Sequence, residues 1–170
     1  LNVENKVEDV TQALLTMARG STRSQEVNEL TKQIIAESVA EEYAAHGITS
    51  DPNSLYEASN NGLEGNMLGK ERKQMPTIGS WYKRIQAKAQ ENMNDDYNFH
   101  YSYLLKVMKQ YIREYDGQMA YFDGQSTFDL LDGTLFINLD ISQLEERFAR
   151  PLAQQVLLSW IWEKYVKKNS

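Results

Sequence analysis

The residues best suited to chemistry are cations and aromatic side chains between positions 70 and 88. Cationic groups bind phosphates and aromatic faces stack on bases, so proteins that bind single-stranded nucleic acid combine the two. Glu71 and Glu91 dilute the charge, which favours an ordinary solvated helix face. The cluster is therefore a possible contact for single-stranded DNA or a protein partner, and it comprises Lys70, Arg72, Lys73, Trp81, Lys83, Arg84 and Lys88.

Nucleotide chemistry would require a phosphate-binding loop of the form G-x-x-x-x-G-K-[ST], whose backbone N–H groups wrap the phosphates. The segment GLEGNMLGKER is the nearest match. Its Gly65 and Gly69 are one residue too close together, and Glu71 stands where Ser or Thr is needed. The sequence therefore predicts no nucleotide-binding residue, and we expect the chain alone neither to bind nor to hydrolyse ATP.

Metal and acid–base sites are also not expected. The chain has no Cys, and its two His, His46 and His100, are far apart in sequence. The acidic pairs 95–96 and 145–146 are adjacent residues, which point about 100° apart on a helix and so do not face one cleft. No catalytic residue, cofactor or metal is predicted.

Composition indicates a mainly helical globular chain of 170 residues. Only 3 Pro and 9 Gly interrupt it, and its net charge of −6 argues against a dedicated duplex-DNA binder. No apolar run reaches the roughly 18 residues of a membrane-spanning helix, so no transmembrane segment is expected. The lack of Cys fits a reducing, cytoplasmic location. No leader is recognisable, and the first residue, Leu1, favours a piece of a longer or processed protein.

Apolar spacing predicts four helices, at about 3–19, 25–46, 78–93 and 97–115. Residues 49–76 are expected to form a long loop, with one helical turn near Leu55. The fourth helix has the most regular stripe, so its tyrosines are expected to pack in the core. That stripe consists of Tyr97, Tyr101, Leu104, Met108, Tyr111 and Tyr115.

The pattern changes after position 117. Residues 135–140 are expected to form a buried strand, followed by a helix that has Pro151 in its first turn and ends near Lys167. The apolar face of this helix is predicted to contain Leu152, Val156, Leu157, Trp160 and Ile161. A strand followed by a helix is half of a βαβ unit, which requires a sheet. We therefore expect a helical subdomain, 1–117, and a strand–turn–helix piece of an α/β core, 118–170.

Four segments, in order along the chain, resemble the traffic ATPases of type IV secretion and conjugation systems, the TraC/TrsE-like family. They are KVEDVTQALLTMARG, ELTKQIIAESVAEEYAAHGIT, MPTIGSWYKRI and, the most specific, FDGQSTFDL with TLFINLDISQLEERFARPLAQQVLLSWIWEKYV. The resemblance implies that 1–117 is the helical insertion of a RecA-like motor and that 118–170 belongs to the motor core.

The Walker A and Walker B motifs of that family would both lie outside this chain. ATP, magnesium, self-association and contact with other secretion components are thus implied for the full-length protein, in the cytoplasm at the inner face of the bacterial membrane. Two alternatives remain open: a stand-alone helical protein-interaction module, and an accessory domain that binds single-stranded nucleic acid.

Overall fold

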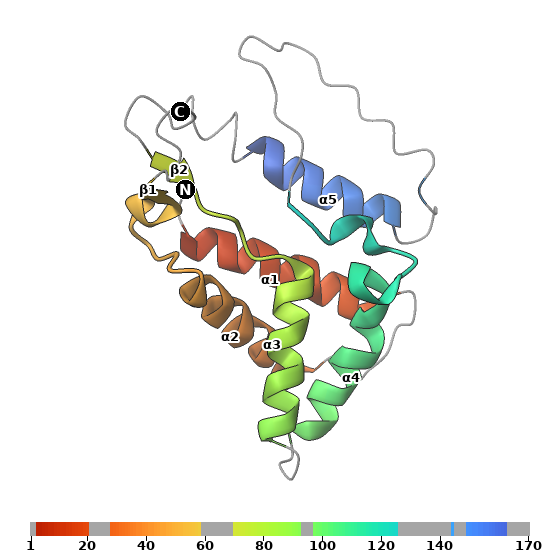
Figure 1. Ribbon diagram of the computed structural model, residues 1–170. Helices are drawn as coiled ribbons and strands as arrows, with labels where there is room; N and C mark the ends of the chain where they lie inside the picture. The colour runs from red at the N-terminus through yellow and green to blue at the C-terminus, as the bar shows by residue number, and fades with distance from the viewer. Residues whose placement is uncertain are drawn as a thin grey trace.

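The computed structural model describes residues 3–20, 28–58, 70–92, 97–125, 144 and 149–162. This part of the chain is mainly helical, as predicted (Figure 1). Its helices are α1 (Val3–Arg19), α2 (Glu29–Ala45), α3 (Ile78–Glu91), α4 (Asn98–Met108) and α5 (Ala149–Ile161). A two-stranded sheet is formed by β1 (Tyr56–Ala58) and β2 (Lys70–Arg72). The expected strand 135–140 lies outside the described residues, so the RecA-like core stays a prediction.

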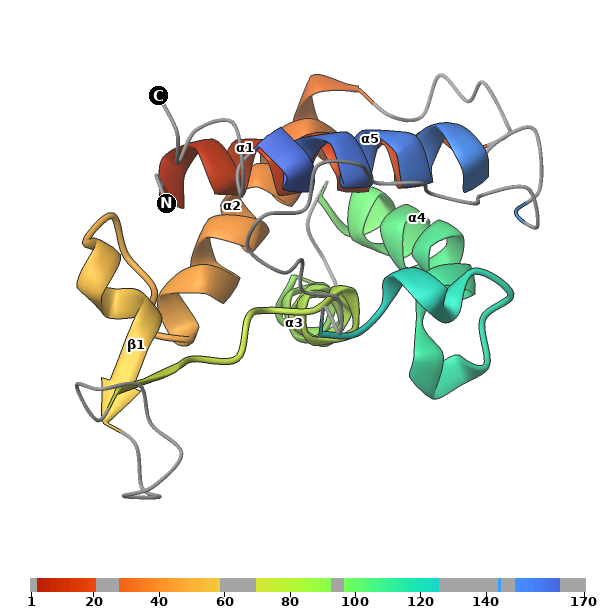
Figure 2. The ribbon, with the colours of Figure 1, turned by 90° about the horizontal axis from the view of Figure 1, so that it is seen from above.

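One hydrophobic core connects all five helices. α1 packs on α2, α2 on α3, α3 on α4, and α5 on α1. Figure 2 shows α1 and α5 lying along each other, with α3 viewed almost end-on beneath them. The side chains most completely removed from water include Leu15, Ile35, Ile85, Leu104, Met108, Tyr111, Ile112 and Leu152. No described helix is long and apolar enough to span a membrane.

The beginnings of α2 and α3 are fixed by capping side chains. The carboxamide of Asn28 accepts a hydrogen bond from the Thr31 backbone N–H, so α2 begins later than the predicted residue 25. Thr77 and Ser80 form a reciprocal capping box at the start of α3. This box fixes the direction of α3, which carries most of the predicted contact residues.

The predicted fourth helix is too long at its C-terminal end. α4 ends at Met108 and is followed by two short 3-10 turns, Lys109–Tyr111 and Arg113–Tyr115. Tyr101 and Tyr111 are buried as expected, but Tyr97 and Tyr115 are exposed, so their assignment to the core was wrong. A helix that unwinds at Met108 no longer places Tyr115 on the same face as Tyr101.

The helix ends at Met108 because a later segment, the strap (residues 119–125), forms hydrogen bonds with the backbone groups that would continue the helix. The Met119 N–H donates to the Gln110 carbonyl, and the buried Asp123 carboxylate accepts from the Arg113 N–H at 3.0 Å. Asp123 also accepts from the Gly79 N–H at 2.8 Å, near the start of α3. The strap thereby joins α3 to the end of α4.

The predicted loop 49–76 contains regular structure that the sequence did not indicate. Pro52–Leu55 form a 3-10 turn, close to the expected helical turn. β1 and β2 then pair antiparallel, with Tyr56 opposite Arg72. Three-residue strands that are mostly polar carry no alternating apolar pattern, which is why this hairpin was missed.

The helix predicted near the C-terminal end of the chain is confirmed in part by α5. Pro151 lies in its first turn, and Leu152 is fully buried against the other helices. Val156 was also expected on the apolar face, yet it is 39% exposed. The predicted continuation to Lys167 lies outside the described residues.

Candidate functional site

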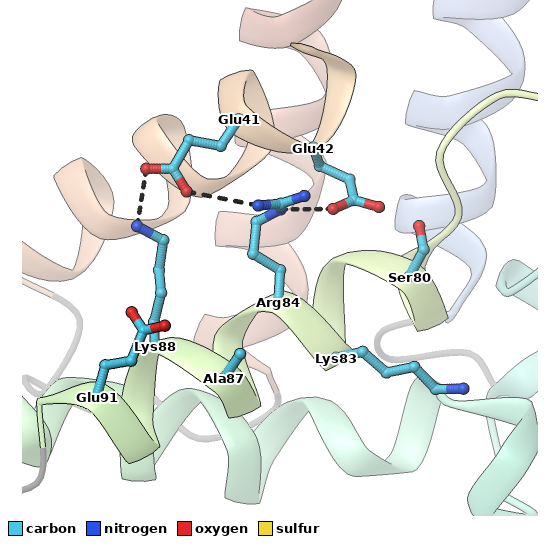
Figure 3. A pocket seen from close by; sticks show the side chains of 8 residues that line it. All are labelled: Glu41, Glu42, Ser80, Lys83, Arg84, Ala87, Lys88 and Glu91. Carbon is cyan, nitrogen blue, oxygen red and sulfur yellow. Dashed lines mark hydrogen bonds and ion pairs between the residues drawn. The ribbon is translucent and has the colours of Figure 1, made fainter. Parts of the chain in front are cut away.

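A charged groove of about 420 Å³ lies between α2 and α3 (Figure 3). It contains three carboxylates and three cations, so its formal charge is balanced. The residues that line it are Glu41, Glu42, Ser80, Lys83, Arg84, Ala87, Lys88 and Glu91. Three of the predicted contact residues, Lys83, Arg84 and Lys88, are among them.

Helical spacing explains why Arg84 and Lys88 face α2. The two residues are four positions apart, so they lie on the same side of α3. Trp81 and Ile85 project from another side of α3 and are buried in the core. Packing of α3 on α2 then brings both cations to the adjacent residues Glu41 and Glu42.

Two of the cations in the groove, Arg84 and Lys88, pair with two of its carboxylates, Glu41 and Glu42. The Arg84 Nε donates to Glu42 Oε2 at 2.5 Å, and Arg84 Nη1 lies 3.9 Å from Glu41 Oε2. The Lys88 ammonium donates to the other Glu41 oxygen at 2.7 Å. The Glu42 side chain is only 7% exposed, so its charge depends on this pairing more than the outer charges do.

Lys83 lines one end of the groove, but its side chain points away from Glu41 and Glu42 (Figure 3). Its ammonium lies 2.7 Å from Glu114 Oε2, and both side chains are well exposed. The hydrogen bond and negative charge of Glu114 raise the pKa of Lys83 above its usual value. Lys83 therefore remains a cation throughout the neutral range.

The other predicted contact residues do not join this surface. Lys73 donates to the Gly47 carbonyl at 2.9 Å, and Arg72 is exposed on β2, while the side chain of Lys70 lies outside the described part. Trp81 is 3% exposed, and its indole N–H donates to the Ser38 hydroxyl at 2.8 Å. The proposed stacking role of Trp81 is therefore wrong, because its ring is enclosed by protein.

Tyr82, the aromatic residue that follows Trp81 in the sequence among the cations of the predicted cluster, is also buried. Its hydroxyl donates to the Leu105 carbonyl at 3.0 Å, which ties α3 to α4. Burial, together with the nearby Tyr115, raises the pKa of Tyr82. Neither aromatic ring of the cluster is thus presented to a base.

A second, apolar cavity of about 190 Å³ lies on the other side of Glu42. α1, α2, the start of α3, the strap and α5 contribute to its wall. The described residues that line it are Val10, Ala13, Leu14, Met17, Val39, Glu42, Tyr43, Pro76, Thr77, Ile78, Trp81, Phe122, Gly124 and Val156. Among the residues that the structure describes, Glu42 alone borders both this cavity and the groove.

The groove offers polar recognition and no evident reactive group. Within the described ranges, no cluster of three or more His, Asp or Glu side chains could hold a metal ion. His46 and His100 are used locally: His46 Nδ1 lies 2.9 Å from the Glu42 carbonyl, and His100 Nδ1 lies 3.0 Å from the Thr31 hydroxyl. A groove whose formal charge is balanced, and in which Arg84 and Lys88 are already paired with carboxylates, is suited to a polar protein surface more than to a phosphate backbone.

Sequence reasoning identified the cations of the groove but missed Glu41 and Glu42. Glu42 is separated from Arg84 by 42 positions, and Glu41 is separated from Lys88 by 47. No local pattern connects residues so far apart. The only usable signal would have been the opposite charges on two helices already expected to be neighbours.

No protein-family model, curated protein or solved structure matches this chain.

Proposed function

We propose that this chain is the helical insertion, with an adjoining piece of the core, of a motor ATPase that serves conjugation or type IV secretion. On this proposal the helical part binds protein partners and performs no catalysis. The observation that carries the binding role is the α2–α3 groove, where Arg84 and Lys88 are both neutralised by carboxylates. The motor assignment is supported by the order of the four resembling segments.

The partners on this proposal are other components of the secretion apparatus and further copies of the motor. The chain would act in the cytoplasm, at the inner face of the membrane, where those partners hold it. ATP and magnesium would be bound by parts of the full-length protein outside this chain. A stand-alone interaction module would use the same groove but would have no motor attached to it.

The nucleic-acid alternative has lost its main support. It required aromatic rings among free cations, and both Trp81 and Tyr82 are buried. We expect no measurable binding of a labelled single-stranded oligonucleotide at low salt. Binding that weakens steeply as salt is raised would restore this alternative.

The motor assignment can be tested on the coding DNA and on the isolated chain. The full reading frame should encode a G-x-x-x-x-G-K-[ST] loop before this segment and a strand ending in an acidic residue after it. A full reading frame that lacks both motifs would refute the assignment to a motor ATPase. The isolated chain should not hydrolyse ATP, and turnover that Lys70→Ala abolishes would show that the imperfect glycine loop is active.

The binding role is best tested by exchanging charges within one ion pair. The double variant Glu41→Lys/Lys88→Glu keeps an ion pair between positions 41 and 88, gives up the longer contact of Glu41 with Arg84, and reverses the charge pattern that a partner meets. In the full-length motor it should reduce DNA transfer at least about tenfold, the effect of roughly 1.4 kcal/mol, while ATP hydrolysis is retained. The matched control Glu29→Lys/Lys32→Glu exchanges an exposed pair on α2, away from the groove. Equal transfer by both variants would contradict the binding role.

A further inference from the structure

The apolar cavity described above extends from the hydrophobic core to the surface. Its wall includes Leu14, Met17 and Trp81, which are all buried in the core. Its wall also includes two exposed residues, Gly124 of the strap and Val156 of α5. The cavity therefore has a buried apolar interior and a mouth between the strap and α5. A concave, mostly apolar shape of this kind is typical of sites for small molecules.

The cavity offers little to a charged ligand. The carboxylate of Glu42 accepts a hydrogen bond from Arg84, so this part of the wall carries no net charge that could attract an ion. The indole N–H of Trp81 is likewise engaged, because it donates to the Ser38 hydroxyl at 2.8 Å. A charged ligand would lose its hydration on entering the cavity without gaining a counterion in return. A neutral, apolar ligand avoids this cost.

The volume and the lining of the cavity favour a single aromatic ring. An engineered apolar cavity of about 150 Å³ is large enough to bind benzene. The cavity here measures about 190 Å³, which leaves room for a ring with one small substituent. Tyr43, Trp81 and Phe122 line it and can make ring-to-ring contacts with such a ligand. The polarisable thioether of Met17 also interacts favourably with aromatic rings.

We propose that this cavity is a binding site for a small neutral aromatic molecule, which enters between the strap and α5. Atoms that line a void have no partners on one side, so a bound ring supplies van der Waals contacts that the empty cavity lacks. This site goes beyond the proposed function, because it takes a small molecule and opens at a different surface from the charged groove.

Titration of toluene into the intact chain, followed by NMR of methyl-labelled methionine, tests the site. Met17 lines the cavity, whereas Met108 is fully buried elsewhere in the core and serves as the internal control. Toluene should shift the Met17 signal saturably, with a dissociation constant of about 1 mM or lower, and leave the Met108 signal unchanged. Benzoate carries the same ring with a negative charge and should shift neither signal at the same concentrations. Absence of a saturable Met17 shift with toluene, or an equal shift with benzoate, would refute the proposed site.

Two blocking variants, each with a matched control, assign the binding to this cavity. Val156→Phe places a larger side chain at the mouth, and Leu158→Phe introduces the same ring at an exposed position of α5 outside the lining. Ala13→Leu fills the cavity from α1, and Ala40→Leu makes the same change at an exposed position of α2. Each blocking variant should weaken toluene binding at least about tenfold, whereas the two controls should bind toluene as the wild type does.

The two blocking variants act at different depths, so the test does not depend on either one alone. Ala13→Leu can disturb the packing of α1, but Val156→Phe changes an exposed position and should leave the fold intact. Circular dichroism identifies the variants that are folded. Toluene binding at wild-type strength in every folded blocking variant would show that the ligand does not occupy this cavity.

Discussion

Replacement of Arg84 with methionine should be the most damaging single change at the groove. Methionine retains the apolar length of the side chain but removes the cation opposite Glu42. The Glu42 side chain, 7% exposed, would then hold a charge between the groove and an apolar cavity wall. Packing of α2 on α3 places Glu42 beside Arg84.

The expected loss can be worked out from the burial of the pair. Removing one partner of a fully buried ion pair costs about 3–5 kcal/mol. Arg84 is 27% exposed, so water already screens part of this interaction, and His46 Nδ1 lies 3.7 Å from the second Glu42 oxygen. We therefore expect Arg84→Met to lower the free energy of unfolding by about 2–4 kcal/mol.

Urea unfolding followed by circular dichroism measures this loss, and a double-mutant cycle assigns it to the pair. Glu42→Gln combined with Arg84→Met removes both charges, so it should recover about 1–3 kcal/mol of the single-variant losses. The exposed pair of Lys83 and Glu114 is the matched control on another side of α3, and its cycle should show no coupling beyond experimental error. Equal coupling in the two cycles would refute the reasoning from burial.

Two further predictions concern the strap and the core. Asp123→Asn should lower the free energy of unfolding by about 2–3 kcal/mol, because one amide oxygen cannot replace a carboxylate that accepts from both Gly79 and Arg113. The exposed Asp116→Asn is its control in urea unfolding, and equal losses would contradict the bridging role. Burial raises the pKa of Tyr111 above 10.0, so only the unfolded state ionises near that pH and stability should fall as pH rises through it. Tyr111→Phe should flatten this decline in urea midpoints, and an unchanged slope would rule out Tyr111 as its cause.

Local patterns predicted the helices well where local interactions decide them. The stripe from Val3 to Met17 gave α1 its observed bounds, and Pro76 with Thr77 marked the beginning of α3 correctly. These signals are effective because apolar spacing and capping act within one or two turns. Nothing beyond the segment itself was needed.

The errors arose where distant residues compete for the same backbone. The spacing of apolar residues favoured a helix through Tyr115, but Asp123 takes the Arg113 N–H and the strap takes the Gln110 carbonyl. The groove likewise depends on contacts between residues that are distant in the sequence. Arg84 and Lys88 were recognised as cations, yet their neutralisation by α2 could not be seen without the packing of the two helices.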